Sequence, residues 1–328
     1  MTAPPTRRVR TSEDFGGIEL DVVDAGRHGD PVIVLAHGWP ESSHSWRHQI
    51  EPLVDAGYRV LVPDQRGYAG SSAPREVAAY RSDHLAADLC ALLDDVDADT
   101  AIFVGHDWGS LVVWDLARFR PERVSAIVNV SVPYTPWPIR PTDLFRSVYA
   151  DRFFYMLYFQ LPDRPEQELE ADVETTLRTI LWTGSAEMAG PPPDPSKLPS
   201  LEHGTVLGTF AHGKVVPTDL PTWLTRADLD RYVDQFTTSG FFGPTGWYRN
   251  IDADWELTRD LPAPAMPCAF IGGDKDGVIA HRMEYVDRMR DSLPDFRGVE
   301  LIADAGHWTQ QERPAEFNAA LLRLLAQL

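Results

Sequence analysis

The chain has 328 residues, which is enough for one large hydrophobic core or two smaller ones. Its content of 43% hydrophobic and 24% charged residues is ordinary for a globular protein and excludes extended disorder over most of the chain. The formal net charge of −19 would repel phosphate backbones, so nucleic acid is not expected as a partner, and an anionic substrate is disfavoured.

The chain has two cysteines, Cys90 and Cys268, which lie in apolar stretches far apart in the sequence. We expect two buried free thiols, which fits a reducing compartment. The N-terminus lacks the apolar segment of a signal peptide, and no apolar run approaches the roughly 20 residues of a membrane helix. The prediction is a cytoplasmic protein without a membrane span. The sequence does not decide between a monomer and a homodimer.

Short apolar runs alternate with helical patterns between about residues 30 and 132. The runs are continuously apolar, as expected for strands buried on both faces of a sheet. They are Pro31–Ala36, Arg59–Val62, Thr100–Val104 and Val124–Val132. Between them, Ser82–Val96 carries leucines at helical spacing. This alternation predicts a parallel sheet with helices on both faces, preceded by antiparallel strands at Arg7–Arg10 and Ile18–Asp24.

The pattern changes after Val132-Pro133, and helical segments follow until about Pro262. Helices are predicted at Asp143–Gln160, Glu166–Leu181 and Ala227–Phe236, with a proline-rich loop at Gly190–Pro199. Thr225 and Asp228 have the spacing of a capping box for the last of these helices.

The alternating pattern resumes near residue 263. Strands are predicted at Pro267–Ile271 and Gly298–Ile302, and helices at His281–Asp291 and from Pro314 onward. We therefore expect one α/β core, residues 1–133 and 263–328, interrupted by a helical cap, residues 134–262. A ligand would bind between them, at the carboxyl ends of the strands.

The segment Gly105-His106-Asp107-Trp108-Gly109 follows a predicted strand and begins a helix. This is the setting of the Gly-x-Ser-x-Gly nucleophile elbow of the α/β-hydrolase fold, with Asp in place of Ser. The alternative, that Asp107 only caps the helix, is less favoured because two glycines stand at the required spacing.

A carboxylate nucleophile attacks saturated carbon and leaves an alkyl ester on the enzyme, which water must then hydrolyse. An oxyanion hole would stabilise that second step, and backbone N–H groups of Trp39 and Trp108 are the expected donors. Trp39 belongs to His37-Gly38-Trp39-Pro40, directly after a predicted strand. The alternative for this segment is a simple tight turn.

Gly306-His307-Trp308 lies between the last predicted strand and the last helix, where a histidine can act as general base. The acid that orients it is expected after the preceding strand, where both Asp274 and Asp276 stand, and spacing alone does not choose between them. The chain order nucleophile, acid, histidine fits this fold. His106 precedes the nucleophile, and its side chain is expected to point away from it.

With these motifs the sequence resembles the epoxide hydrolases of the α/β-hydrolase superfamily, over nearly its whole length. The shared segments are His37-Gly38-Trp39-Pro40, Asp64-Gln65-Arg66-Gly67-Tyr68, Gly105-His106-Asp107-Trp108-Gly109, Tyr155-Met156-Leu157-Tyr158-Phe159-Gln160, Trp247-Tyr248-Arg249-Asn250 and Gly306-His307-Trp308-Thr309-Gln310. The resemblance implies that Tyr155 and Tyr248 donate hydrogen bonds to the epoxide oxygen. It also implies that Asp276 is the acid and that the peptide before Pro40 is cis. Trp39 is a departure, since the family usually has Phe there.

The resulting hypothesis is hydrolysis of a neutral, fairly apolar epoxide to a vicinal diol, without a metal or an organic cofactor. One alternative is a haloalkane or haloacid dehalogenase, which shares the Asp, His and acid but needs halide-binding donors. Dehalogenases often have Asn at the position of Trp39, and the tyrosine pair favours the epoxide. The other alternative is a non-catalytic capped binding protein, which an intact set of Asp107, Asp276 and His307 argues against.

Overall fold

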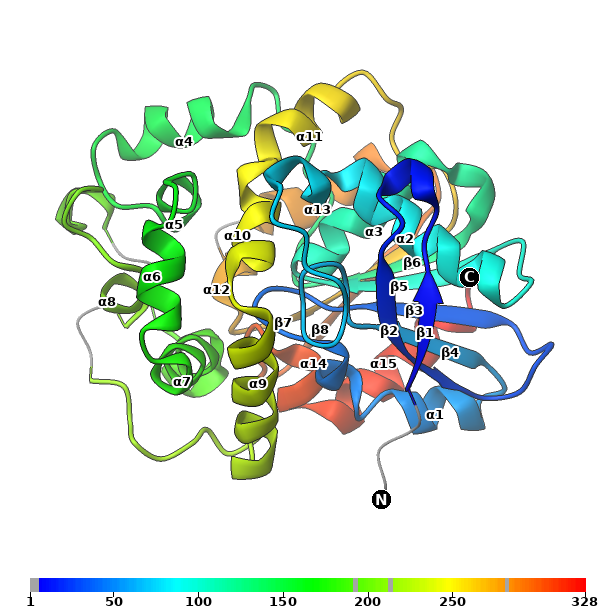
Figure 1. The fold of residues 1–328 in the computed structure, drawn as a ribbon. Coiled ribbons are helices and arrows are strands. Elements are labelled where there is room, and N and C mark those ends of the chain that lie inside the picture. The colour runs from blue at the N-terminus through cyan, green and yellow to red at the C-terminus, as the bar shows by residue number, and fades with distance from the viewer. Residues whose placement is uncertain (1–5, 191–193, 212–214, 281–282) are drawn as a thin grey trace.

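Eight strands form one sheet in the order β1-β2-β4-β3-β5-β6-β7-β8 (Figure 1). The computed structural model describes residues 6–190, 194–211, 215–280 and 283–328. The strands are β1 (Thr6–Arg10), β2 (Glu19–Ala25), β3 (Val32–Ala36), β4 (Arg59–Pro63), β5 (Ala101–His106), β6 (Val124–Val130), β7 (Cys268–Gly273) and β8 (Phe296–Ile302). Strand β1 pairs antiparallel with β2, and β2 with β4, while all other pairs are parallel. The predicted mostly parallel sheet is confirmed.

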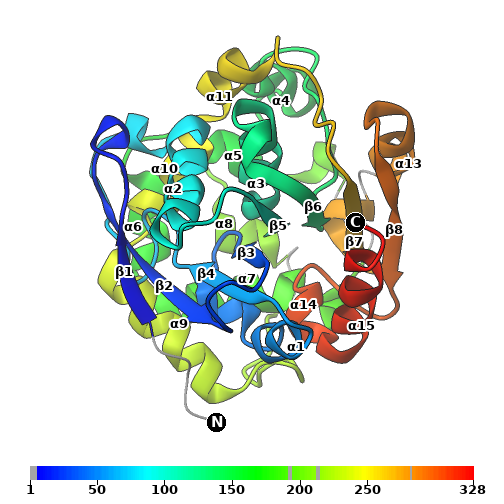
Figure 2. The same ribbon diagram turned by 90° about the vertical axis from the view of Figure 1, so that its right-hand side faces the viewer.

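Helices cover both faces of the sheet, as Figure 2 shows. Helices α2 (Ser82–Asp95), α3 (Trp108–Phe119) and α13 (Met283–Ser292) contribute to one hydrophobic cluster with the sheet. Helices α1 (Ile50–Asp55) and α15 (Pro314–Leu325) contribute to the cluster on the other side. The central strands are buried on both faces because side chains of alternate residues belong to alternate clusters, as Ile33 and Val34 do.

The register of the parallel strands brings their carboxyl ends to one edge of the sheet. Ala36 of β3 pairs with Gly105 of β5, and Gly273 of β7 pairs with Ile302 of β8. The loops that follow β3, β5, β7 and β8 therefore meet at that edge, which is where ligands bind in parallel α/β sheets.

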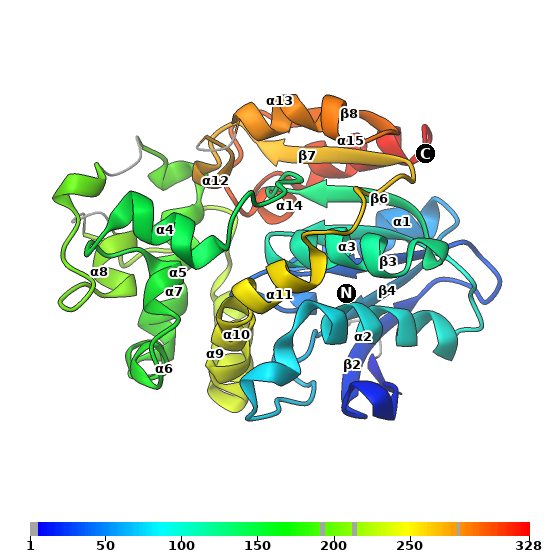
Figure 3. The ribbon, with the colours of Figure 1, turned by 90° about the horizontal axis from the view of Figure 1, so that it is seen from above.

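The segment between β6 and β7 contains helices joined by loops. Most of these helices lie beyond this edge of the sheet (Figure 3). They are α4 (Pro141–Tyr149), α5 (Tyr155–Tyr158), α6 (Arg164–Glu170), α7 (Val173–Gly184), α8 (Val206–Phe210), α9 (Arg226–Ser239), α10 (Phe242–Arg249) and α11 (Ile251–Thr258), and together they are called the helical insertion below. Among the described residues, no helix is long and apolar enough to cross a membrane.

Two predicted helices of the insertion are each divided in the structure. Asp143–Gln160 was expected as one helix, but α4 ends at Tyr149 and Ala150 adopts a positive φ of 50°. Glu166–Leu181 is likewise split, because Asp172 caps a new helix by accepting a hydrogen bond from the Thr175 backbone N–H. Each break occurs at a single residue, Ala150 or Asp172, which leaves the hydrophobic pattern almost unchanged. The pattern therefore did not predict either break.

Three further sequence predictions can be compared with the described residues. The capping box of Thr225 and Asp228 is present at the start of α9. The predicted helix His281–Asp291 begins outside the described residues and continues as α13. The loop Gly190–Pro199 is also only partly described, and its described part contains a short 3-10 turn at Pro195–Lys197.

Candidate active site

Asp107 lies at the sharp turn between β5 and α3, with φ 49° and ψ −117°. A non-glycine residue rarely adopts this conformation, and strain of this kind is concentrated at functional sites. The flanking glycines make the turn sterically feasible. A Cβ atom on Gly105 would lie 2.4 Å from the carbonyl oxygen of Gly109, and one on Gly109 would lie 2.2 Å from that of Ala36.

The turn after β3 places backbone donors against this carboxylate. The Trp39 N–H donates a hydrogen bond of 2.8 Å to Oδ1 of Asp107, and the Trp39–Pro40 peptide is cis. A Cβ on Gly38 would lie 2.5 Å from the Cβ of Asp107, so only glycine fits this close approach. Trp108 is the first residue of α3, where backbone N–H groups have no partner within the helix.

His307 lies between two carboxylates, in the loop between β8 and α14 (Thr309–Glu312). Its Nδ1 is 3.1 Å from Oδ2 of Asp276, and its Nε2 is 3.6 Å from Oδ2 of Asp107. Asp276 is buried and also accepts a 2.8 Å hydrogen bond from the Val278 N–H, whereas Asp274 is exposed. The structure thus brings Asp107, His307 and Asp276 together and leaves Asp274 outside the group.

These contacts determine the charge states of the group. Burial opposes the charged form of His307, but the charge of Asp276 and the interaction of the His307 N–H with the Asp107 carboxylate outweigh it, so the pKa of His307 lies well above its ordinary value. Burial also opposes ionisation of Asp107. The hydrogen bond and charge of His307 outweigh that effect, so the pKa of Asp107 lies below its ordinary value. Both directions favour a charged pair, an Asp107 carboxylate beside a His307 imidazolium, in the free protein.

A cavity of about 60 Å³ lies above Asp107, and both predicted tyrosines line it. Tyr155 comes from α5 and Tyr248 from α10, and their ring centroids are 5.7 Å apart. Apolar side chains form most of the remaining wall. They include Leu111, Val132, Phe145, Met156, Ile251 and Val278.

The two tyrosines differ from their neighbour Tyr158, whose hydroxyl donates a 2.8 Å hydrogen bond to Glu168 and does not line the cavity. Burial raises the pKa of Tyr248 well above its ordinary value, and the nearby Tyr155 and Asp107 add to this effect. Tyr248 is therefore a neutral phenol, which can donate its proton to a ligand oxygen.

The sequence did not indicate Glu41, which forms a fully buried pair with His106. Oε2 of Glu41 lies 2.7 Å from Nδ1 of His106 and accepts a 3.1 Å hydrogen bond from the Gly38 N–H. Nε2 of His106 lies 2.8 Å from the carbonyl oxygen of His307. The His106 side chain thus points away from the cavity, yet it connects the Trp39 turn to the His307 loop. The only signal in the sequence is a glutamate directly after Pro40.

A sharp elbow that carries a carboxylate, a histidine and a second acid beside it, and a helical insertion beyond the sheet edge are the features of an α/β hydrolase. The comparisons agree with this class. Residues 31–189 match the family model described as the alpha/beta hydrolase fold.

Whole-chain comparisons give a narrower assignment. Epoxide hydrolase A of Mycobacterium tuberculosis is 42% identical, covering 100% of this chain and 99% of that protein. The bifunctional epoxide hydrolase 2 of Rattus norvegicus is 35% identical over 94% of this chain and 54% of its own length. The crystal structure of epoxide hydrolase A from Mycobacterium thermoresistibile is 43% identical with a TM-score of 0.84, covering 99% of this chain and 98% of that one. The chain belongs to the epoxide hydrolase family.

Proposed function

We propose that this chain converts a neutral, fairly apolar epoxide and water to a vicinal diol through an ester on Asp107. Membership of the epoxide hydrolase family supports the overall reaction. The observation that carries the mechanism is the position of the Asp107 carboxylate, which faces a cavity lined by two tyrosines and lies 3.6 Å from His307.

In the first step an oxygen of Asp107 attacks one carbon of the epoxide ring, and the ring C–O bond breaks. The developing alkoxide accepts hydrogen bonds from Tyr155 and Tyr248 and takes a proton from one of these phenols, which becomes a phenolate. Because the cavity wall is largely apolar, hydrogen bonds and charges inside it are stronger than they would be in water. The product of this step is a hydroxyalkyl ester of Asp107.

In the second step water attacks the carbonyl carbon of the ester. Esterification removes the negative charge of Asp107, which is one of the two charges that keep His307 protonated. The pKa of His307 then falls, and the proton that it releases restores the phenol that protonated the alkoxide. The neutral imidazole, oriented by Asp276, takes a proton from the attacking water. Backbone N–H groups of Trp39 and Trp108 stabilise the tetrahedral oxyanion, and each such donor contributes about 3 kcal/mol. The ester C–O bond then breaks, and the imidazolium gives its proton to the leaving oxygen to release the diol. The Asp107 carboxyl group returns its proton to His307, which restores the starting state.

The wider assignments rest on the same features. The division into a core of residues 1–133 and 263–328 and a cap of residues 134–262 is supported by the position of the helical insertion over the cavity. A cytoplasmic location is supported by the two buried free cysteines, whose thiol pKa values burial raises. The apolar cavity wall and the net charge of −19 favour a neutral small molecule and disfavour nucleic acid.

The most direct test of the reaction is a panel of terminal and internal epoxides with detection of the diol. We expect diol formation from epoxides and no halide release from a matched panel of haloalkanes. An Asp107→Asn variant should form no diol. Halide release without diol formation would favour a dehalogenase instead, and the absence of turnover with both panels would favour a binding protein.

A further inference from the structure

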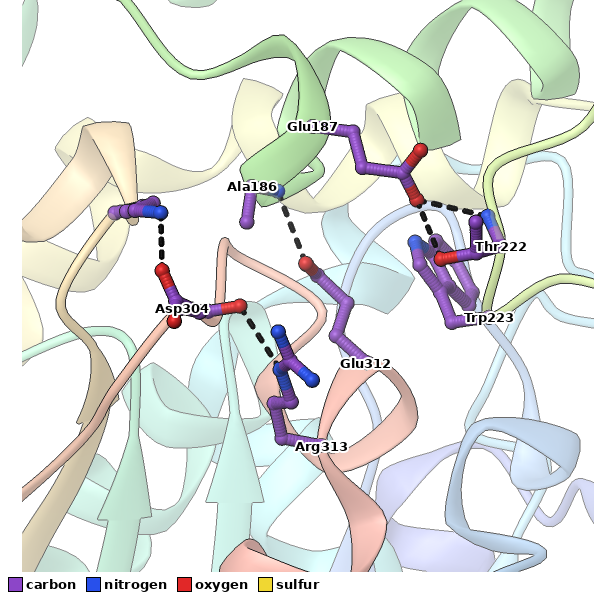
Figure 4. Close-up of a pocket in the computed structure, with 8 residues that line it drawn as sticks. Ala186, Glu187, Thr222, Trp223, Asp304, Glu312 and Arg313 are labelled. Carbon is purple, nitrogen blue, oxygen red and sulfur yellow. Dashed lines mark hydrogen bonds and ion pairs between the residues drawn. The ribbon is translucent and has the colours of Figure 1, made fainter.

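Glu312 is the last residue of α14, five positions after His307, and its carboxylate collects three backbone hydrogen bonds. Oε2 accepts them from Ala186 at 2.9 Å and from Gly306 at 3.0 Å, and Oε1 accepts one from Trp308 at 3.1 Å. Figure 4 shows this carboxylate pointing toward Ala186, at the wall of a cavity of about 200 Å³. This cavity is separate from the one above Asp107, and its lining includes neither His307 nor a tyrosine.

Two of these donors, Gly306 and Trp308, flank His307 directly. The His307 N–H itself donates a 2.7 Å hydrogen bond to the carbonyl oxygen of Gly184, at the end of α7. A Cβ on Gly306 would lie 2.4 Å from the Ala186 nitrogen. The His307 loop is therefore in close contact with the segment that follows α7 in the helical insertion. Glu312 thus joins the backbone on both sides of the base to the insertion.

Three N–H groups that converge on one point form a site that a carboxylate anion satisfies far better than a neutral group. Removing the charge would leave these donors, of which Gly306 and Trp308 are buried, with weaker partners, and the loop would relax. His307 has little tolerance for such a shift, because its ring must place a water molecule against the Asp107 ester. A misplacement of about 1 Å at a reacting centre can cost about 100-fold in rate.

We propose that Glu312 is a positioning residue for ester hydrolysis, which holds the His307 imidazole in place by fixing the peptide groups before and after it. This inference rests on the proposed function. Ring opening depends on Asp107, Tyr155 and Tyr248. Among the described residues, the hydrogen bonds to the Glu312 carboxylate come from other residues. The two chemical steps should therefore respond differently to its loss.

The test is a Glu312→Gln variant studied by rapid-quench single turnover with styrene oxide as the probe. We expect ring opening to stay within about twofold of the wild-type rate and ester hydrolysis to slow about tenfold or more. The ester on Asp107 should accumulate and be visible as a mass increase. In the steady state kcat and KM should fall together, so that kcat/KM changes little.

Glu187→Gln is the matched control, because Glu187 lines the same cavity but, among the described residues, its carboxylate accepts hydrogen bonds only from Thr222. It should leave both rates at wild-type values. If Glu312→Gln proves unstable in a thermal melt, the shorter carboxylate of Glu312→Asp replaces it, and we expect the same selective loss.

Two results would overturn the inference: hydrolysis of the ester at the wild-type rate, or an equal loss in both steps in a folded variant. A His307→Gln variant run in parallel separates this inference from the proposed function. If neither His307→Gln nor the wild type ever forms an ester, the mechanism itself is wrong. If His307→Gln accumulates the ester and Glu312→Gln does not, only the role of Glu312 is wrong.

Discussion

At the scale of single residues, the charge on His307 depends on the two carboxylates beside it. Asp276 is held by the Val278 N–H and lies 3.1 Å from Nδ1 of His307, whereas Asp107 loses its charge when it forms an ester. In the proposed mechanism the same histidine is an imidazolium beside Asp107 in the free enzyme and a base in the intermediate. No separate switch is needed, because the chemistry of Asp107 itself changes the pKa of His307.

This dependence predicts the effect of Asp107→Asn, which removes the charge but keeps the size of the side chain. The pKa of His307 is raised well above its ordinary value in the wild type, so it should fall in the variant. The imidazolium would then lose its proton at a lower pH on titration. NMR of the histidine ring nitrogens across a pH series measures this shift. Asp274→Asn is the control, since Asp274 is exposed, and it should leave the titration unchanged. An unchanged or higher pKa in Asp107→Asn would contradict the account.

Residue type and spacing identified Asp107 and His307 from the sequence alone, because an elbow and a terminal histidine loop have strict positions in this fold. They did not choose between Asp274 and Asp276, two residues apart on a loop, because that choice depends on which side chain turns inward. Almost nothing in the sequence indicated the roles of Glu312 and Glu41. Their roles come from hydrogen bonds to backbone groups of distant segments, which a sequence pattern does not record.

At the scale of elements, the two tyrosines come from different helices of the insertion, α5 and α10. Tyr155 begins a helix of only four residues, and Tyr158 ends it, so helical spacing alone did not decide which of them faces the cavity. Contacts do decide it. Tyr155 lines the cavity beside Tyr248, while the hydroxyl of Tyr158 bonds to Glu168.

We therefore expect Tyr155→Phe combined with Tyr248→Phe to slow ring opening by about 100-fold or more, because both donors to the alkoxide are lost. Hydrolysis of an ester already formed should change much less, since it uses His307 and the Trp39 N–H. Single-turnover kinetics resolves the two steps. Tyr158→Phe is the control and should keep both rates. A larger loss in ester hydrolysis than in ring opening would show that the tyrosines have a different role.

Amphipathic patterns predicted α2, α9 and α15 well, because each buries one apolar face. The pattern failed at α10, which contains Gly243, Pro244 and Gly246, residues of low helix propensity. This helix forms because it packs closely on the core, where a Cβ on Gly243 would lie 2.6 Å from the Cα of Gly67. Tertiary packing therefore overrides local propensity at the helix that carries Tyr248.

This close contact predicts that Gly243→Ala destabilises the protein by about 1–3 kcal/mol, because the added methyl group has no room against the backbone. Chemical denaturation measures the change. Gly277→Ala is the matched control, since no described atom beyond its own chain neighbours and helix backbone lies within 4 Å of a Cβ at that position, and its effect should be small. A Gly243→Ala variant as stable as the wild type would mean that α10 and the core are not packed so closely.

At the scale of the whole molecule, the register of the sheet gathers the parts of the site from distant segments. The loops after β3, β5, β7 and β8 supply the Trp39 N–H, Asp107, Asp276 and His307 at one edge. The alternation of strands and helices was sufficient to predict this arrangement, because parallel connections place successive carboxyl ends at the same edge. The shape of the insertion above it was less predictable, since its short helices are fixed by contacts with the core.

The central claim is that water attacks the Asp107 ester and not the epoxide. It is tested most directly by a single turnover in H₂¹⁸O with enzyme in excess. The account predicts that the diol of this first turnover contains no ¹⁸O and that the peptide carrying Asp107 gains the label. Incorporation of ¹⁸O into the first-turnover diol, with an unlabelled Asp107 peptide, would contradict it.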